Sequence, residues 1–243
     1  MLRADKLLSQ TVPGVSRTLA ASLIEGGFVT ANGKKVQKCA ELLPDGAEFF
    51  IAENPLTRYV SRGGLKLEAA LDAFSLDVKN KICADLGAST GGFTDCLLRR
   101  GAAKVYAVDS GSNQLHPSLR SDPRVVSMEN RNARDLTGEE FEKVDLAVMD
   151  VSFISQSLLY DAVCRVLKPD GIFLSLIKPQ FEAGKSEIGK NGVVKSEKTR
   201  LSVIAALKEK AAARGLMMKK TIPSPILGGD GNREFLALFE RRQ

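Results

Sequence analysis

The sequence predicts an α/β protein in which a doubly wound, mostly parallel sheet follows a small α+β domain. Three observations lead to this prediction. Short apolar runs alternate with helix-like segments from residue 64 onward, as in parallel sheets whose strands are joined by helices. A glycine-rich turn at residues 87–92 follows one apolar run and leads into a helix. The first 40 residues have a different pattern, which indicates a domain at 1–57, a linker at 58–63 and the α/β domain at 64–243.

The composition of the chain excludes several classes of protein. Its 243 residues, 44% of them hydrophobic, are enough for one large core and a small accessory domain. The longest apolar runs have only the length of a strand, and charged residues interrupt the N-terminus, so we expect neither a membrane span nor a secretion signal. The four cysteines lack the Cys-x-x-Cys spacing and there is only one histidine, so we expect no metal site and reduced thiols in the cytoplasm.

The N-terminal domain is expected to contain two short helices followed by a hairpin. Ser16 is the expected N-cap of the second helix, and Gly26-Gly27 is expected to end it. Asn32-Gly33 is a strong signal for a two-residue hairpin turn. This pattern resembles the αL RNA-binding module found in a small-subunit ribosomal protein, in pseudouridine synthases and in bacterial tyrosyl-tRNA synthetases.

Positive charge is concentrated in two regions of the chain. Residues 1–40 contain six basic and two acidic residues, and residues 178–220 contain eleven basic and four acidic ones. Such regions favour a polyanionic partner. An ordinary solvated surface remains the better interpretation of the helix around Lys208 and Lys210, and the N-terminal arginines could instead only cap helices. The residues expected to contact RNA are Arg3, Lys6, Arg17, Lys34, Lys35, Arg58 and Arg62.

A helix is expected at residues 64–74, and a strand at 82–86 then leads into the glycine-rich turn and a helix at 92–100. Leu67, Leu71 and Phe74 form the buried face of the first helix, with Lys66 at its edge. The turn lacks the Lys-Ser/Thr pair of a phosphate-binding loop and the G-x-G-x-x-G pattern of dinucleotide sites. An acid, Asp109, ends the next strand, where α/β folds bind ribose hydroxyls.

These features resemble the S-adenosylmethionine site of class I, Rossmann-like methyltransferases. In that family the loop after the third strand grips adenine, although a polar loop is expected there without any function. The resemblance implies that the following residues bind the cofactor: Asp85, Gly87, Ala88, Ser89, Thr90, Gly91, Gly92, Phe93, Asp109, Asn132, Ala133 and Asp150.

The remainder of the chain continues the alternation. Strands are expected at 105–108, 125–128, 144–150, 172–178 and 232–239, and helices at 114–119, 155–167 and 196–214. Ligands of such sheets bind at the carboxyl ends of the strands, where Asp150 and Lys178 are expected to lie. Glu234, at the start of the last strand, can face the same pocket. Any one of these residues alone is more often solvated or paired than catalytic.

Five motifs together resemble the TlyA, or hemolysin A, family of ribosomal RNA methyltransferases. They are RYVSRGGLKL, DLGASTGGFTD, MDVSFIS, LIKPQFE and NREF, and the resemblance covers essentially the whole chain. It implies S-adenosylmethionine-dependent 2′-O-methylation of cytidine in ribosomal RNA or ribosomal subunits, with the large subunit favoured. The related FtsJ-like domain implies a catalytic tetrad, which Lys66, Asp150, Lys178 and Glu234 match.

The resemblance implies that Lys178 is the general base. A lysine ammonium must first lose its proton; Asp150 and Glu234 oppose this loss, whereas Lys66, the cofactor's sulfonium charge and desolvation by RNA favour it. We therefore expect Lys178 to act as a base only in the ternary complex. We also expect alanine variants of all four residues to fold and to lose methyl transfer. The alternative functions are a membrane-active cytolysin and a ribosome-assembly factor that binds RNA without transferring a methyl group.

Overall fold

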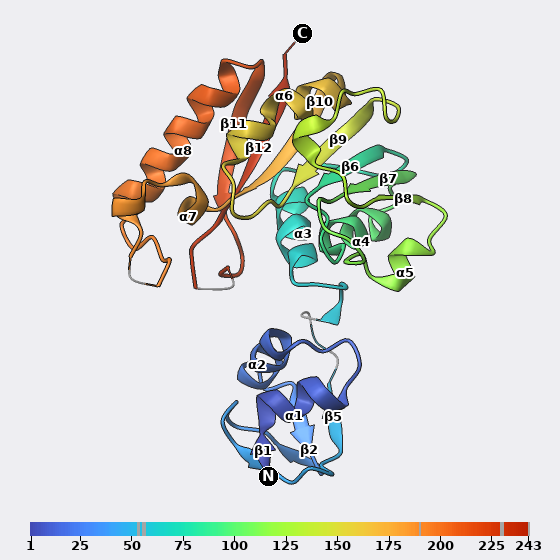
Figure 1. Ribbon diagram of the computed structural model, residues 1–243, viewed down its shortest axis with the longest axis vertical. Coiled ribbons are helices and arrows are strands. Elements are labelled where there is room, and N and C mark those ends of the chain that lie inside the picture. The colour runs from blue at the N-terminus through green and yellow to red at the C-terminus, as the bar shows by residue number, and fades with distance from the viewer. Residues whose placement is uncertain (53, 55–56, 190, 229–230, 243) are drawn as a thin grey trace. The chain divides into compact units, whose positions relative to one another are not determined.

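The structure, a computed structural model, describes residues 1–52, 54, 57–189, 191–228 and 231–242 (Figure 1). The chain divides into two compact units, Met1–Arg58 and Tyr59–Gln243. Each unit has its own hydrophobic core, as domains of these sizes require.

The first unit packs two helices against small antiparallel sheets. Ser16 caps the second helix as expected, because its hydroxyl accepts a hydrogen bond from the backbone N–H of Leu19 at 3.2 Å. The hairpin turn also lies where expected, since Asn32 and Gly33 both have positive φ. The elements are β1 (Leu2–Arg3), α1 (Ala4–Thr11), α2 (Arg17–Glu25), β2 (Val29–Ala31), β3 (Lys34–Lys35), β4 (Leu42–Leu43) and β5 (Phe49–Ile51). In the sheets, β2 lies between β3 and β5, and β1 pairs with β4.

The second unit is built on a seven-stranded sheet with the order β11-β12-β10-β9-β6-β7-β8. The strands are β6 (Ile82–Leu86), β7 (Lys104–Val108), β8 (Val125–Met128), β9 (Val144–Met149), β10 (Leu167–Ile177), β11 (Leu216–Pro223) and β12 (Phe235–Arg241). The five strands from β10 to β8 are parallel, whereas β12 runs antiparallel to both of its neighbours. The predicted doubly wound, mostly parallel sheet is confirmed.

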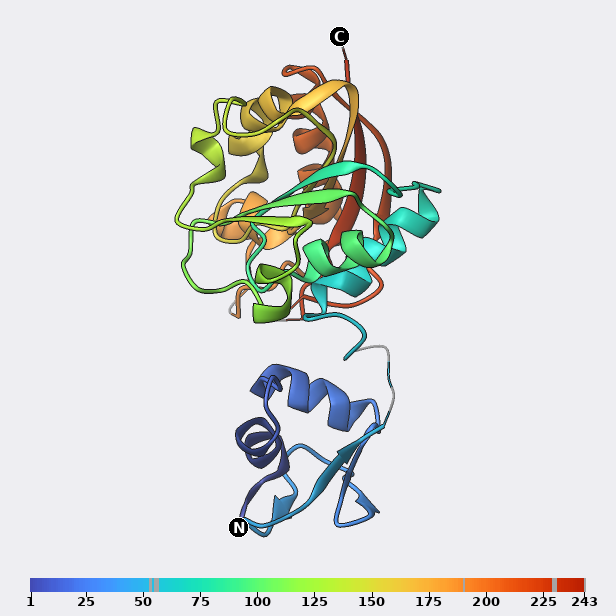
Figure 2. The ribbon, with the colours of Figure 1, turned by 90° about the vertical axis from the view of Figure 1, so that its right-hand side faces the viewer.

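Helices cover both faces of this sheet, so the unit has three layers (Figures 1 and 2). Neighbouring strand residues alternate between the two cores: Cys83 belongs to the core beneath α3 and α4, and Ala84 to the core beneath α6 and α8. The helices are α3 (Gly63–Ala73), α4 (Gly92–Arg99), α5 (Pro117–Arg120), α6 (Tyr160–Val166), α7 (Pro179–Glu182) and α8 (Glu197–Ala212). Short 3₁₀ turns lie at η2 (Ala133–Asp135), η3 (Gln156–Leu159) and η4 (Lys185–Glu187).

Apart from shifts in where elements begin and end, such as the start of β10 at Leu167, two parts of the structure differ from the expectation. The edge strand β11 was not expected, because an edge strand has one open side and its middle residues, Lys219 to Thr221, are exposed. The expected linker at 58–63 is not a linker from Tyr59 onward. Tyr59 is buried and donates a hydrogen bond to Glu68 at 2.9 Å, and the backbone N–H of Val60 donates to Asp95 at 2.9 Å. These contacts make the segment from Tyr59 onward part of the second unit, although its composition is typical of a turn.

Candidate active site

The register of the sheet brings distant parts of the chain to one edge. The last residue of β10, Ile177, pairs with the first residue of β12, Phe235, and the last residue of β9, Met149, pairs with Leu86 of β6. The residues that immediately follow or precede these pairs therefore lie together at the carboxyl ends of the parallel strands. They are Asp150, Lys178 and Glu234, and α3 contributes Lys66 beside them.

Lys178 and Asp150 form one ion pair of the site. The Lys178 Nζ lies 2.6 Å from the Asp150 Oδ1 and donates a hydrogen bond to the Ser152 Oγ at 2.7 Å. The two charged side chains are 12% and 22% exposed, so the pair is largely shielded but still reachable. Only the contact with Ser152 is a hydrogen bond, and the Asp150 Oδ1 has no hydrogen-bond partner among the described residues, so the ammonium keeps N–H donors for an acceptor that enters from the cavity.

Lys66 and Glu234 form the second ion pair, at greater depth. The Lys66 Nζ lies 2.5 Å from the Glu234 Oε2, and the side chains are 10% and 2% exposed. Lys66 lines the cavity described next, whereas Glu234 lies behind it and lines neither cavity. Glu234 therefore borders the first cavity only indirectly, through its ion pair with Lys66.

Two cavities open beside these pairs and share four lining residues, Gly87, Ser89, Asp150 and Ser152. The first, of about 260 Å³, lies between the two lysines and the glycine-rich turn. The second, of about 450 Å³, extends towards the ends of β7 and β8. Their combined extent suits an elongated small molecule.

Most of the predicted cofactor residues line one cavity or the other. The first cavity is lined by Asp85, Gly87, Ala88, Ser89, Thr90, Gly92, Phe93 and Asp150, and the second by Asp109, Asn132 and Ala133, together with Gly87, Ser89 and Asp150. Gly91 lines neither; it is the N-cap of α4, with φ of +94°, and a Cβ there would lie 2.3 Å from Leu119.

The glycine-rich turn approaches the backbone of the Asp150 loop closely. Gly87 has φ of +85°, and a Cβ there would lie 3.0 Å from the Asp150 carbonyl oxygen, so glycine suits both the conformation and the space. Asp109 holds the turn from the other side, because its carboxylate accepts hydrogen bonds from the backbone N–H groups of Ser89 at 2.8 Å and Gly111 at 2.7 Å. These hydrogen bonds fix the conformation of the turn where it lines both cavities, and we call this turn the cradle.

Asp85 is a fully buried acid in the wall of the first cavity. Its Oδ2 accepts hydrogen bonds from the Thr94 backbone N–H at 3.0 Å and from the Thr94 hydroxyl at 2.7 Å. Its Oδ1 has no hydrogen-bond partner among the described residues. Burial raises the pKa of Asp85 to about 7, even though the bonds from Thr94 favour the charged form.

The raised pKa of Asp85 leads us to expect that the free energy of unfolding depends on pH. Because this pKa lies above its unfolded value of 3.8, the contribution of Asp85 to the free energy of unfolding falls as the pH rises from about 4 to about 7, and is constant above. We expect a slope of up to about 1.4 kcal/mol per pH unit. Denaturant unfolding of the wild type and of Asp85→Asn at pH 5, 6, 7 and 8 checks this, because the slope should be absent from the variant. Parallel curves would contradict it.

Other residues of the site were not singled out from the sequence. Ser61 and Ser152 line the first cavity, and Arg62, expected to contact RNA, lines it too and is half-buried. Phe153 lines the second cavity, is 87% exposed with φ of +67°, and its ring centroid lies 5.1 Å from that of Phe181. The Val-Ser-Phe sequence after Asp150 was the available signal for Ser152 and Phe153. From the sequence alone, however, a phenylalanine is expected to lie in the core.

The remaining predicted RNA contacts lie in the first unit and are exposed. Arg3 and Arg17 are brought together, because both donate to the carboxylate of Asp5. The others lie elsewhere on the unit: Lys6 on α1, Lys34 and Lys35 on β3, and Arg58 at its end. Over the described part of the chain, no helix is long and apolar enough to cross a membrane, and no cluster of histidine, cysteine and acidic residues could hold a metal ion.

Comparison with known proteins assigns the chain to a family. The FtsJ-like methyltransferase family matches residues 59–241. The chain is 42% identical to the 16S/23S rRNA (cytidine-2′-O)-methyltransferase TlyA of Mycobacterium tuberculosis, over 96% of this chain and 87% of that protein. It is 41% identical to Hemolysin A of Brachyspira hyodysenteriae, over 98% and 99%. A solved structure from Streptococcus thermophilus, described as a hemolysin, has a TM-score of 0.81 at 43% identity, covering 99% of this chain and 88% of that one. The chain therefore belongs to the FtsJ-like methyltransferase family, and its relatives over nearly its whole length include TlyA and Hemolysin A.

Proposed function

We propose that this protein transfers the methyl group of S-adenosylmethionine to the ribose 2′-hydroxyl of a cytidine in ribosomal RNA. The observation that carries the proposal is the meeting of two lysine–carboxylate pairs beside the glycine-rich cradle. A base held next to a cofactor pocket suits the activation of a hydroxyl, which is a poor nucleophile while it keeps its proton.

The cradle fits S-adenosylmethionine. Gly87 lies so close to the Asp150 carbonyl that a side chain would not fit there. The Asp85 Oδ1, which has no hydrogen-bond partner among the described residues, suits a cationic or hydrogen-bonding group in the first cavity. Asp109 and Asn132 lie in the second cavity, where they would hold the adenosine end. When bound, this cofactor supplies an electrophilic methyl carbon next to a positively charged sulfur.

In this mechanism Lys178 in its neutral form takes the proton of the 2′-hydroxyl on its Nζ. Asp150 and Ser152 fix the position of that nitrogen, and Asp150 stabilises the ammonium once the proton has arrived. Lys66, held by Glu234, adds a positive charge in the same cavity. These residues thus align the acceptor hydroxyl and accept its proton. Alignment alone can lower the activation barrier by roughly 7 to 11 kcal/mol.

The substrate class follows from the relatives and from the first unit. The mycobacterial relative is named for cytidine 2′-O-methylation of both ribosomal RNAs. The exposed basic residues of the first unit suit RNA phosphates, which position an RNA without reading its sequence. We propose that this unit binds ribosomal RNA, as naked RNA or within a subunit, with the large subunit favoured, and that the protein works in the cytoplasm.

The direct test is to map the transferred methyl group. We expect purified protein with tritium-labelled S-adenosylmethionine to label large-subunit RNA, small-subunit RNA or assembled subunits, and nucleoside analysis to identify 2′-O-methylcytidine. Labelling of a base carbon or nitrogen would contradict the proposed acceptor. Binding of RNA without any transfer in single turnover would instead support an assembly factor, and leakage of liposomes would support a cytolysin.

A further inference from the structure

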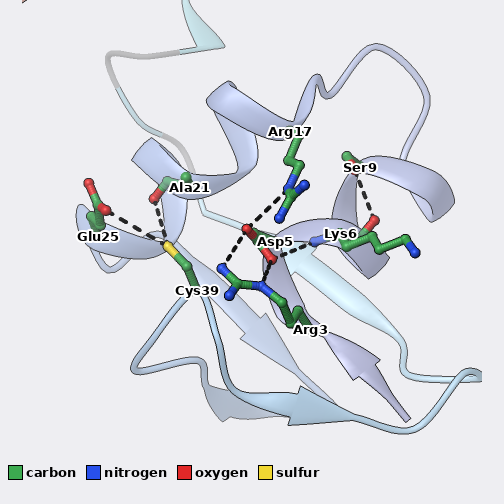
Figure 3. A network of polar contacts seen from close by, with 8 residues as sticks. All are labelled: Arg3, Asp5, Lys6, Ser9, Arg17, Ala21, Glu25 and Cys39. Carbon is green, nitrogen blue, oxygen red and sulfur yellow. Dashed lines mark hydrogen bonds and ion pairs between the residues drawn. The ribbon is translucent and has the colours of Figure 1, made fainter. Parts of the chain in front are cut away.

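A buried carboxylate lies within the basic surface of the first unit. Asp5, in the first turn of α1, is 4% exposed. It accepts hydrogen bonds from the Nε and Nη2 of Arg3 at 3.0 and 3.1 Å, from the Nε of Arg17 at 3.3 Å, and from the backbone N–H of Lys6 at 2.9 Å (Figure 3). One acid therefore holds two arginines that come from different elements, the end of β1 and the start of α2.

The contacts leave both arginines available to a ligand. The Arg3 side chain is 48% exposed and that of Arg17 is 61% exposed, although Asp5 beneath them is buried. Each guanidinium has five N–H donors, and Asp5 uses only two from Arg3 and one from Arg17. Asp5 is ionised at neutral pH, because the Arg3 guanidinium above all lowers the pKa of this carboxyl to about 2.

We propose that Asp5 is a positioning residue for RNA binding, which holds Arg3 and Arg17 together as a site for one RNA phosphate. This proposal rests on the proposed function, because it takes RNA as the polyanion. Two guanidiniums repel each other, and a shared carboxylate between them offsets that repulsion. Their long side chains would otherwise lose rotamer freedom when they bind a phosphate, and here much of that freedom is already lost before RNA arrives.

A purely electrostatic view of this surface makes the opposite prediction. Asp5 lowers the net positive charge of the unit by one, so its neutralisation should tighten binding of any polyanion. In the positioning view, neutralisation weakens binding because the two guanidiniums separate and become mobile. The sign of the change in affinity therefore decides between the two views.

The test compares two substitutions that make the same change of charge in the full-length protein. Asp5→Asn removes the buried carboxylate, and Asp45→Asn removes an acid of the same unit whose side chain is 74% exposed. Binding to transcribed large- and small-subunit ribosomal RNA, without cofactor, is measured at about 50 and 200 mM salt. We expect affinity to fall on the order of tenfold for Asp5→Asn and to stay equal or rise for Asp45→Asn.

Steady-state methylation separates positioning from a general loss of structure. We expect KM for RNA to rise in Asp5→Asn with kcat unchanged, since the catalytic pairs belong to the second unit. If Asp5→Asn unfolds the first unit in thermal denaturation, Arg17→Lys provides the test. It keeps the charge but loses the guanidinium fork, so we expect several-fold weaker RNA binding.

Two binding results would overturn the proposal while leaving the function intact: RNA affinity that is equal or higher in Asp5→Asn, or, should that variant unfold, unchanged affinity in Arg17→Lys. A fall of kcat with KM unchanged would also overturn it. If the wild type neither binds ribosomal RNA nor methylates it, the proposed function fails and this proposal fails with it.

Discussion

Substitution of Lys178 by arginine is expected to lower the rate of methyl transfer by roughly 100- to 10,000-fold, the usual contribution of a general base. Arginine keeps the positive charge and can still pair with Asp150, which lies 2.6 Å from the lysine nitrogen. A guanidinium does not lose its proton in proteins, so it cannot accept one from a hydroxyl. The variant separates a base from a residue that only supplies charge. Single-turnover transfer at saturating cofactor measures the effect, and equilibrium dialysis checks that S-adenosylmethionine still binds.

The chain provides a matched control for this substitution. Lys168 and Asp145 form a second lysine–aspartate pair between the same two strands, β10 and β9, with 2.7 Å between Nζ and Oδ1. This pair lies at the start of β9, at the opposite end from Asp150, and lines neither cavity of the candidate active site. Lys168→Arg should therefore leave the transfer rate within about twofold. Turnover in Lys178→Arg close to that of the wild type would remove Lys178 as the base.

Substitution of Glu234 by leucine is expected to lower the free energy of unfolding of the second unit by about 3 to 5 kcal/mol. The loss arises because the Lys66 Nζ, whose side chain is only 10% exposed, loses its carboxylate partner. For a unit of this size the melting temperature should fall by roughly 6 to 20 °C. Thermal unfolding followed by circular dichroism measures the change.

The double variant Lys66→Met with Glu234→Leu tests the cause of this loss. A buried ion pair replaced by apolar residues of similar size often restores stability, so we expect the melting temperature to return to within a few degrees of the wild type. Methyl transfer should stay low, because the positive charge in the cavity is gone. A double variant as unstable as Glu234→Leu alone would show that packing, and not the unpaired charge, causes the loss. The same measurements test the sequence-based expectation that alanine variants of these residues fold.

Local patterns predicted most strands of the parallel sheet, the helix at 64–74 and the hairpin at Asn32-Gly33, because each of these elements has its own signal in the residues that form it. The same reasoning missed β11 and took Tyr59 for part of a linker. β11 is held as a strand by its pairing with β12, and Tyr59 is buried by its packing against α3 and α4. Neither contact leaves a periodic signal in the segment itself.

The sequence by itself determined the fold class and the glycine-rich turn, and its resemblance to a known family predicted that Lys66, Asp150, Lys178 and Glu234 share one candidate site. The catalytic roles of those four residues stay a prediction. Only the tertiary structure decided how they meet: Lys66 and Glu234 are 168 positions apart, and their contact depends on the packing of α3 beside β12. It also decided that Glu234 lies behind the cavity, and that Asp5 holds Arg3 and Arg17 from beneath. Such contacts depend on strand register and on helix packing between distant segments, which no local pattern contains.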